Sequence, residues 1–154
     1  MKLLMNIAAV LFCSAFAAQA QDLTTYDQWE ADKTRVFDSA DVHLEDLQWL
    51  VRPLVVFADT PNDPRFVRQM ELLVSRMDEL AERDVIVLTD TDPAAMSDVR
   101  TQLRPRGFML ALLAKDGTVA FRKPTPWDVR EISRSIDKMP LREQEIRDRR
   151  DLNQ

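Results

Sequence analysis

The sequence predicts an α/β domain: a mixed sheet with helices on both faces. Short apolar runs rich in valine, at 54–58 and 85–88, are typical of strands buried on both faces. Each run precedes an Asp-Pro pair, at 63–64 and 92–93. Such a pair indicates a helix start, because aspartate caps free amides and proline suits the first helical position. A Lys-Asp-Gly turn at 115–117 predicts a β-hairpin.

The segment before the first clear strand, 21–50, has the least regular pattern. Its aromatic and apolar residues are scattered among charges, so we expect an N-terminal lead with one helical turn or an edge strand. After the strand at 54–58, an amphipathic helix is predicted to start at Pro64. Its apolar side chains repeat at helical spacing from Phe66 to Ala81, and charged residues occupy the opposite face.

The second half of the chain predicts two further strands and two further helices. A short helix follows the strand at 85–88 and runs to Leu103. Gly107 then opens a third buried strand, and the Lys-Asp-Gly turn joins it to a fourth strand at 118–123. Thr125-Pro126 is predicted to cap the last amphipathic helix, which ends or kinks at Pro140.

The predicted element order is β-α-β-α-β-β-α. A right-handed crossover makes the first two strands parallel, and the hairpin completes a mixed sheet. We expect a signal peptide at 1–20, the lead at 21–50, the α/β domain at 51–139 and a charged helical extension at 140–154.

The first twenty residues have the pattern of a secretory signal peptide. Lys2 precedes an apolar core at 3–17, and Ala18-Gln19-Ala20 is a small-residue cleavage site. A membrane anchor is the weaker alternative, since the apolar stretch is shorter than the ~20 residues of a spanning helix. A lipid attachment site is disfavoured because Phe12, rather than a small residue, precedes Cys13. We therefore expect a periplasmic or secreted protein.

Cleavage of this peptide changes the charge and the thiol content of the chain. It leaves 20 basic and 26 acidic residues, a net charge of −6, and it removes Cys13, the only cysteine. The mature chain would have no disulfide, thiol nucleophile or thiolate ligand. Its negative charge disfavours nucleic acid and anionic membranes as partners. An envelope or extracellular protein is the partner we expect, and no cofactor is predicted.

Four segments together resemble a known domain. They are VVFADTPNDPRF at 55–66, DVIVLTDTDP at 84–93, GFMLALLAKDGTVAFRK at 107–123 and TPWDVREISRSIDKMPLREQEIR at 125–147. Their order resembles the thioredoxin fold and, more closely, the P-DUDES domain. That domain is a thioredoxin-like domain of unknown function found in small secreted bacterial proteins and in animal extracellular-matrix and sushi-repeat proteins.

The resemblance implies a thioredoxin-like fold without thiol chemistry. In thioredoxins, the loop after the central strand carries a Cys-x-x-Cys pair, and here the matching positions read Asn62-Asp63-Pro64-Arg65. The proline that thioredoxins place before the next strand is also missing near Phe108 and Met109. Thiol-disulfide exchange and cysteine peroxidase activity are therefore excluded in the mature chain.

Polar residues gather where this fold brings the strand ends to one edge of the sheet, which we call the loop edge. The candidate binding residues are Asp59, Thr60, Asn62, Asp63, Asp90, Asp92, Arg104 and Arg106. The carboxylates suit Ca²⁺ or Mg²⁺, and the arginines beside helix N-termini suit a carboxylate or phosphate. We favour a structural interpretation, in which Asp63 and Asp92 are caps and the other two aspartates pair with the arginines.

No catalytic or metal-binding residue is predicted. His43 is the only histidine, and the serines lie on predicted helices without the context of a nucleophile. The three tryptophans are expected to close the core, although they are also a possible binding surface. The predicted function is a redox-inactive binding or structural module of the cell envelope. The alternative is a cysteine-independent enzyme, or a small-ligand or metal binder, that uses the loop edge.

Overall fold

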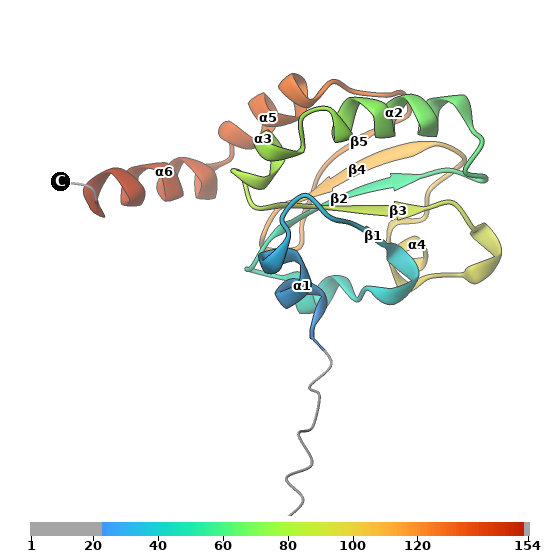
Figure 1. The fold of residues 1–154 in the computed structure, drawn as a ribbon, viewed down its shortest axis with the longest axis horizontal. Coiled ribbons are helices and arrows are strands. Elements are labelled where there is room, and N and C mark those ends of the chain that lie inside the picture. The colour runs from blue at the N-terminus through green and yellow to red at the C-terminus, as the bar shows by residue number, and fades with distance from the viewer. Residues whose placement is uncertain (1–22, 153–154) are drawn as a thin grey trace, which may run out of the picture.

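The computed structural model describes residues 23–152, so the predicted signal peptide and Cys13 lie outside the described residues. A five-stranded mixed sheet forms the centre of the structure (Figure 1). Its strands are β1 (Val36–Asp38), β2 (Arg52–Phe57), β3 (Val85–Asp90), β4 (Met109–Leu113) and β5 (Val119–Lys123). Their spatial order is β1-β3-β2-β4-β5. The strands β1, β3 and β2 are parallel, whereas β4 and β5 are antiparallel to their neighbours.

Helices cover both faces of the sheet, as predicted, which gives a thioredoxin-like α/β fold. The helices are α1 (Thr25–Ala31), α2 (Pro64–Val74), α3 (Met77–Ala81), α4 (Asp98–Leu103), α5 (Val129–Asp137) and α6 (Pro140–Leu152). Three short 3₁₀ helices are η1 (Ser39–Asp41), η2 (Leu44–Leu47) and η3 (Pro93–Ala95). In Figure 1, α2, α3 and α5 cover one face and α1 and α4 the other, while α6 extends away from the sheet.

The strand β2 shows why the valine-rich runs are buried on both faces. Its alternate side chains enter two separate cores: Leu54 and Val56 pack with α2, α3 and α5, whereas Val55 and Phe57 pack with α1 and α4. All four side chains are fully buried. Because a strand alternates its side chains between faces, two covered faces require a continuous apolar run rather than an alternating one.

The first Asp-Pro pair starts a helix as predicted, but the second does not. Asp63 caps α2, and its Oδ1 accepts a hydrogen bond from the backbone N–H of Arg65 at 2.8 Å. The second pair starts only the 3₁₀ turn η3, because Met96 adopts a left-handed backbone with φ of +48°. The helix α4 begins after that residue, where Ser97 is its cap.

Two other predicted helix boundaries were wrong. The long helix expected from Pro64 to Ala81 is two helices, because α2 ends at Val74 and α3 begins at Met77. The last helix starts at Val129 rather than after Thr125-Pro126. Asp128 caps it and accepts a hydrogen bond from the backbone N–H of Arg130 at 2.8 Å. Two cap signals therefore compete within four residues, and the aspartate is the one used.

The N-terminal segment expected to be irregular contains both a helix and an edge strand. Thr24 and Asp27 form a capping box at the start of α1, and β1 pairs with β3. Trp29 of this segment is 1 % exposed and belongs to the core under α1 and α4. Within residues 23–152, no helix combines the length and apolar character needed to cross a bilayer.

Candidate functional site

The first loop of the loop edge, between β2 and α2, is held by a turn and a helix cap. The backbone N–H of Asn62 donates to Thr60 Oγ1 at 3.4 Å, and that of Asp63 donates to the Thr60 carbonyl at 3.2 Å. The Arg65 guanidinium also donates to both carboxylate oxygens of Asp63, at 3.2 and 2.9 Å. These hydrogen bonds lower the pKa of Asp63. Asp63 is therefore a cap and the partner of a cation of its own helix.

Asp90 lies at the end of β3 and is buried. Its Oδ2 accepts hydrogen bonds from the hydroxyls of Ser39 at 2.8 Å and Ser97 at 2.6 Å. Its Oδ1 accepts two more from Arg100, from Nε at 2.9 Å and Nη2 at 2.6 Å. Burial alone would raise the pKa of Asp90, but the hydrogen bonds from Arg100 and the two serines outweigh it and lower the pKa. The carboxylate is thus ionised, and both of its oxygens accept hydrogen bonds from side chains of the same protein.

The partner of Asp90 was predicted wrongly. It pairs with Arg100 of α4 rather than with Arg104 or Arg106, which lie beyond the end of that helix. The exposed fractions are only 4 % for Asp90 and 8 % for Arg100. The same guanidinium also donates to the Ala58 carbonyl at 3.0 Å. Arg100 therefore ties the ends of β2 and β3 to α4.

The two remaining aspartates of the loop edge are exposed. Asp92 caps η3, because its Oδ1 accepts a hydrogen bond from the backbone N–H of Ala94 at 3.0 Å. Asp59 lies beside Gly107, where a Cβ added to the glycine would be 3.8 Å from its Oδ2. Within residues 23–152, no group of three or more histidine, cysteine or acidic side chains is placed to hold a metal ion.

The two arginines of the loop edge come from the segment between α4 and β4. Arg104 ends α4 with a left-handed backbone, φ +49°, and Arg106 lies two residues further on. Together they line a shallow pocket of about 260 Å³. Its complete lining is Arg104, Arg106, Phe108, Met109, Arg122, Lys123 and Pro124, and we call it the arginine pocket. Four cations and no carboxylate therefore surround it.

The cations of the arginine pocket have few partners in the described part of the chain. Neither Arg104 nor Arg106 forms an ion pair with another residue between 23 and 152. Arg122 donates through Nη1 to the Leu103 carbonyl, and the Lys123 ammonium lies 3.9 Å from the ring centroid of Trp127. The predicted pairing of Arg104 and Arg106 with aspartates was wrong.

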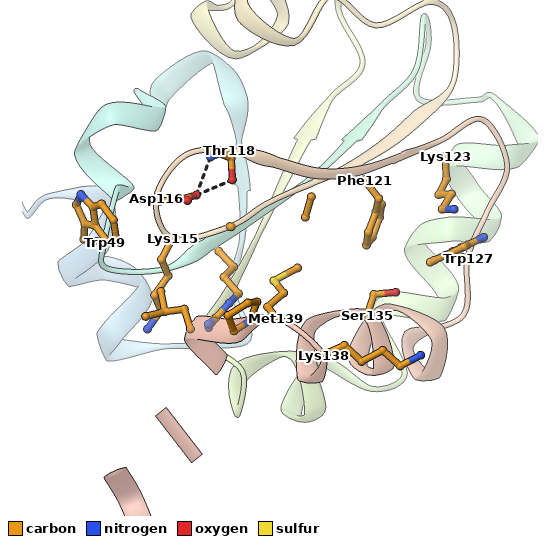
Figure 2. A pocket seen from close by; sticks show the side chains of 15 residues that line it. Trp49, Lys115, Asp116, Thr118, Phe121, Lys123, Trp127, Ser135, Lys138 and Met139 are labelled. Carbon is orange, nitrogen blue, oxygen red and sulfur yellow. Dashed lines mark hydrogen bonds between the residues drawn. The ribbon is translucent and has the colours of Figure 1, made fainter. Parts of the chain in front are cut away.

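A second and larger pocket, of about 620 Å³, was not predicted from the sequence (Figure 2). Its lining is Trp49, Arg52, Ala114, Lys115, Asp116, Thr118, Ala120, Phe121, Lys123, Trp127, Ser135, Lys138, Met139, Pro140 and Leu141. We call it the hairpin pocket, since the β4–β5 hairpin forms one wall and the α5–α6 junction the other. Figure 2 shows Phe121 of the hairpin pointing towards the helical wall, where Met139 and Ser135 lie.

The tryptophans divide between the core and this pocket. Trp29 is buried in the core, as predicted, whereas Trp49 is 64 % exposed. Trp127 is half-buried, and its ring centroid lies 5.2 Å from that of Phe121. No short motif joins the pocket residues in the sequence, because they come from the segment that leads into β2, the start of that strand, the hairpin, the β5–α5 loop and the last two helices.

His43 is exposed and pairs with an aspartate rather than with a serine. Its Nδ1 lies 2.7 Å from Oδ2 of Asp98 on the protein surface. The buried serine Ser97 caps α4 and bonds to Asp90 rather than to the histidine.

A comparison with protein families finds a match to a domain of unknown function. A family model described as a domain of unknown function, DUF4174, matches residues 43–145, which is more than half of the chain. The match begins at His43 and ends at Glu145, so it includes the loop edge and every residue that lines the two pockets. No curated protein matches the chain at a significant level. The chain belongs to the DUF4174 family.

Proposed function

We propose that the chain is an exported, redox-inactive binding module of the cell envelope, and that it holds an acidic segment of a partner protein on the arginine pocket. The signal-peptide pattern of residues 1–20 supports export. The loop that carries cysteines in thioredoxins has Asn62-Asp63-Pro64-Arg65 here, which supports the loss of thiol chemistry. We include the relationship to P-DUDES domains in this proposal.

One observation carries the binding site: four cations surround the arginine pocket and no carboxylate lines it. The chain as a whole has a net charge of −5, so this local excess of positive charge is not a consequence of composition. Arginine presents a planar fork that binds carboxylates in a bidentate manner. Met109 and Pro124 add apolar surface beside the cations.

The alternative, a metal or small-ligand site on the carboxylates of the loop edge, has less support. Asp63 and Asp92 are caps, and the Asp90 carboxylate is neutralised by Arg100. A hard cation needs several oxygen ligands that face one point, and here those oxygens already accept hydrogen bonds from their own chain.

The test is affinity capture from an envelope extract by the mature chain, with free decaglutamate as the competitor. Arg104→Glu with Arg106→Glu reverses two charges of the pocket. The matched control, Arg130→Glu with Arg147→Glu, reverses two exposed charges elsewhere. We expect the wild type and the control to retain an acidic partner that decaglutamate displaces, and the pocket variant to lose it.

Circular dichroism and the melting temperature must show that the pocket variant is folded. Equal capture by the folded pocket variant, or equal loss by the control, would overturn the assignment of the site. A partner that decaglutamate does not displace would contradict the proposed chemistry of the contact.

A further inference from the structure

The hairpin pocket has the size and lining of a small-molecule site. Its volume of about 620 Å³ lies within the ~300–1,000 Å³ of typical ligand pockets. Ala114 and Ala120 leave space along the hairpin, while Phe121, Trp127 and Met139 supply apolar and aromatic surface. Such a lining suits a flat or chain-like apolar body.

Positive charge dominates the same lining. Arg52, Lys115, Lys123 and Lys138 are its cations, and Asp116 is its one carboxylate. Asp116 is engaged in its own turn, where its Oδ1 accepts hydrogen bonds from the Thr118 backbone N–H at 2.9 Å and hydroxyl at 2.7 Å. Those bonds lower the pKa of Asp116. Among the lining residues themselves, an anion would therefore meet four cations and one carboxylate that is already bonded.

Arg52 is the buried cation of this lining. The side chain is 1 % exposed and lines the pocket. Its Nη1 donates to the Arg83 carbonyl at 2.9 Å and its Nη2 to Oε1 of Glu145 at 3.0 Å, but its buried Nε has no hydrogen-bond partner. Buried polar groups are rarely left unpaired, so this Nε calls for an explanation such as a water or an ion beside it.

The protein already holds one carboxylate at this end of the pocket. Oε1 of Glu145, from α6, lies 3.0 Å from both Arg52 Nη2 and Lys115 Nζ. Burial alone would raise the pKa of Glu145, but the hydrogen bonds from Arg52 and Lys115 lower it, so the group is ionised at neutral pH. Arg52 and Lys115 thus form a carboxylate-binding pair, and their charge is offset by Glu145 and by Asp84, whose Oδ2 lies 2.9 Å from Lys115 Nζ.

We propose that the hairpin pocket binds a small amphipathic carboxylate, with Phe121, Trp127 and Met139 around its apolar body and the cationic lining around its carboxylate. Glu145 limits the affinity, because its negative charge offsets Arg52 and Lys115. This site is separate from the arginine pocket, and the two share only Lys123.

The test is isothermal titration of the full mature chain with 1-naphthoate, and with 1-naphthalenemethanol as the neutral analogue of the same ring. We expect naphthoate to bind at least about tenfold more tightly than the alcohol, since the ionic attraction of the lysines acts only on the anion. Ala120→Trp fills an exposed position of the hairpin wall, and it should abolish binding without unfolding the chain.

Charge variants test the role of the cations and of Glu145. Lys138→Glu should weaken naphthoate binding, whereas Lys33→Glu, which lies outside the lining of the hairpin pocket, should not. Glu145→Gln keeps an oxygen acceptor for Arg52 but removes the negative charge, and it should tighten binding by about three- to tenfold. Glu143→Gln, an exposed position of the same helix, is its matched control and should leave the affinity unchanged.

Three results would overturn the inference: no binding of naphthoate to the folded wild type, equal binding of the alcohol, or unchanged binding in folded Ala120→Trp. Weaker binding in Glu145→Gln would contradict its role in limiting affinity. The arginine-pocket variant Arg104→Glu with Arg106→Glu should bind naphthoate normally, so the two proposals can fail separately.

Discussion

Replacing Arg100 by methionine removes the guanidinium that neutralises Asp90 but keeps an unbranched side chain to fill part of the space. Three hydrogen bonds to the aspartate are lost, two to Oδ1 and one to its carbonyl, together with the bond to the Ala58 carbonyl. Asp90 keeps only the hydroxyls of Ser39 and Ser97. A nearly fully buried carboxylate is then left without a counter-charge.

The expected cost follows from this geometry. Removal of one partner of a buried ion pair lowers the free energy of unfolding by about 3–5 kcal/mol. The melting temperature should fall by about 6–20 °C, at roughly 2–4 °C for each kcal/mol in a chain of this size. The double variant Asp90→Asn with Arg100→Met should lose much less than the sum of the two single variants, because no uncompensated charge remains.

Urea unfolding at pH 7, followed by circular dichroism, measures these free energies. The pH dependence has a defined sign, because the pKa of Asp90 is lowered in the folded state. Its stabilisation is present above the unfolded pKa of ~3.9 and is lost as the pH falls through the folded pKa. The gap between the wild type and Arg100→Met should therefore narrow in acid. A loss below about 1 kcal/mol at pH 7, or additive single variants, would refute this account of the pair.

Two further predictions concern the loop edge. Gly107→Ala should lower the free energy of unfolding by about 1–2 kcal/mol, measured by urea unfolding, because φ is +61°, a backbone region that L side chains rarely adopt. The added Cβ would not clash, since Asp59 Oδ2 lies at an ordinary 3.8 Å. An unchanged midpoint would show that this backbone relaxes freely. Millimolar Ca²⁺ or Mg²⁺ should leave the melting temperature unchanged, because Asp63, Asp90 and Asp92 already accept hydrogen bonds; a rise with either cation would restore the metal site as a candidate.

The sheet and the start of α2 were predictable because their signals are local. A run such as 54–58 must be buried on both faces, and Asp63-Pro64 satisfies the first free amides of a helix without help from the rest of the chain. The second Asp-Pro pair carries the same signal, but Met96 turns the chain into the left-handed region three residues after Pro93. The local sequence pattern does not predict that this residue is left-handed.

The N-terminal segment was hard to predict because its core residues belong to different short elements. Trp29 lies on α1, Phe37 on β1 and Leu47 on η2, and all three enter the core under α1 and α4. None of these elements is long enough to show a hydrophobic period, since a helical period needs about two turns to be visible.

The partner of Asp90 had a signal that the prediction did not use. On α4, Val99 and Leu103 mark the buried face, and Arg100 lies three residues before Leu103 on that same face. A cation on the apolar face of a helix needs a buried counter-charge, and Asp90 at the end of an apolar strand is the available one. Arg104 and Arg106 follow the helix, so the helical period does not predict which way their side chains point.

Charge is divided unevenly along the loop edge. The aspartates Asp63 and Asp90 are matched by cations of their own chain, whereas the arginine pocket has cations without a lining carboxylate. Since the chain is acidic overall, its long-range field repels anions, and salt screens that field over about 10 Å. Affinity for an anion must then come from hydrogen bonds and apolar contacts inside a pocket. Added salt should weaken such binding less than it weakens binding to a basic protein that attracts anions from a distance.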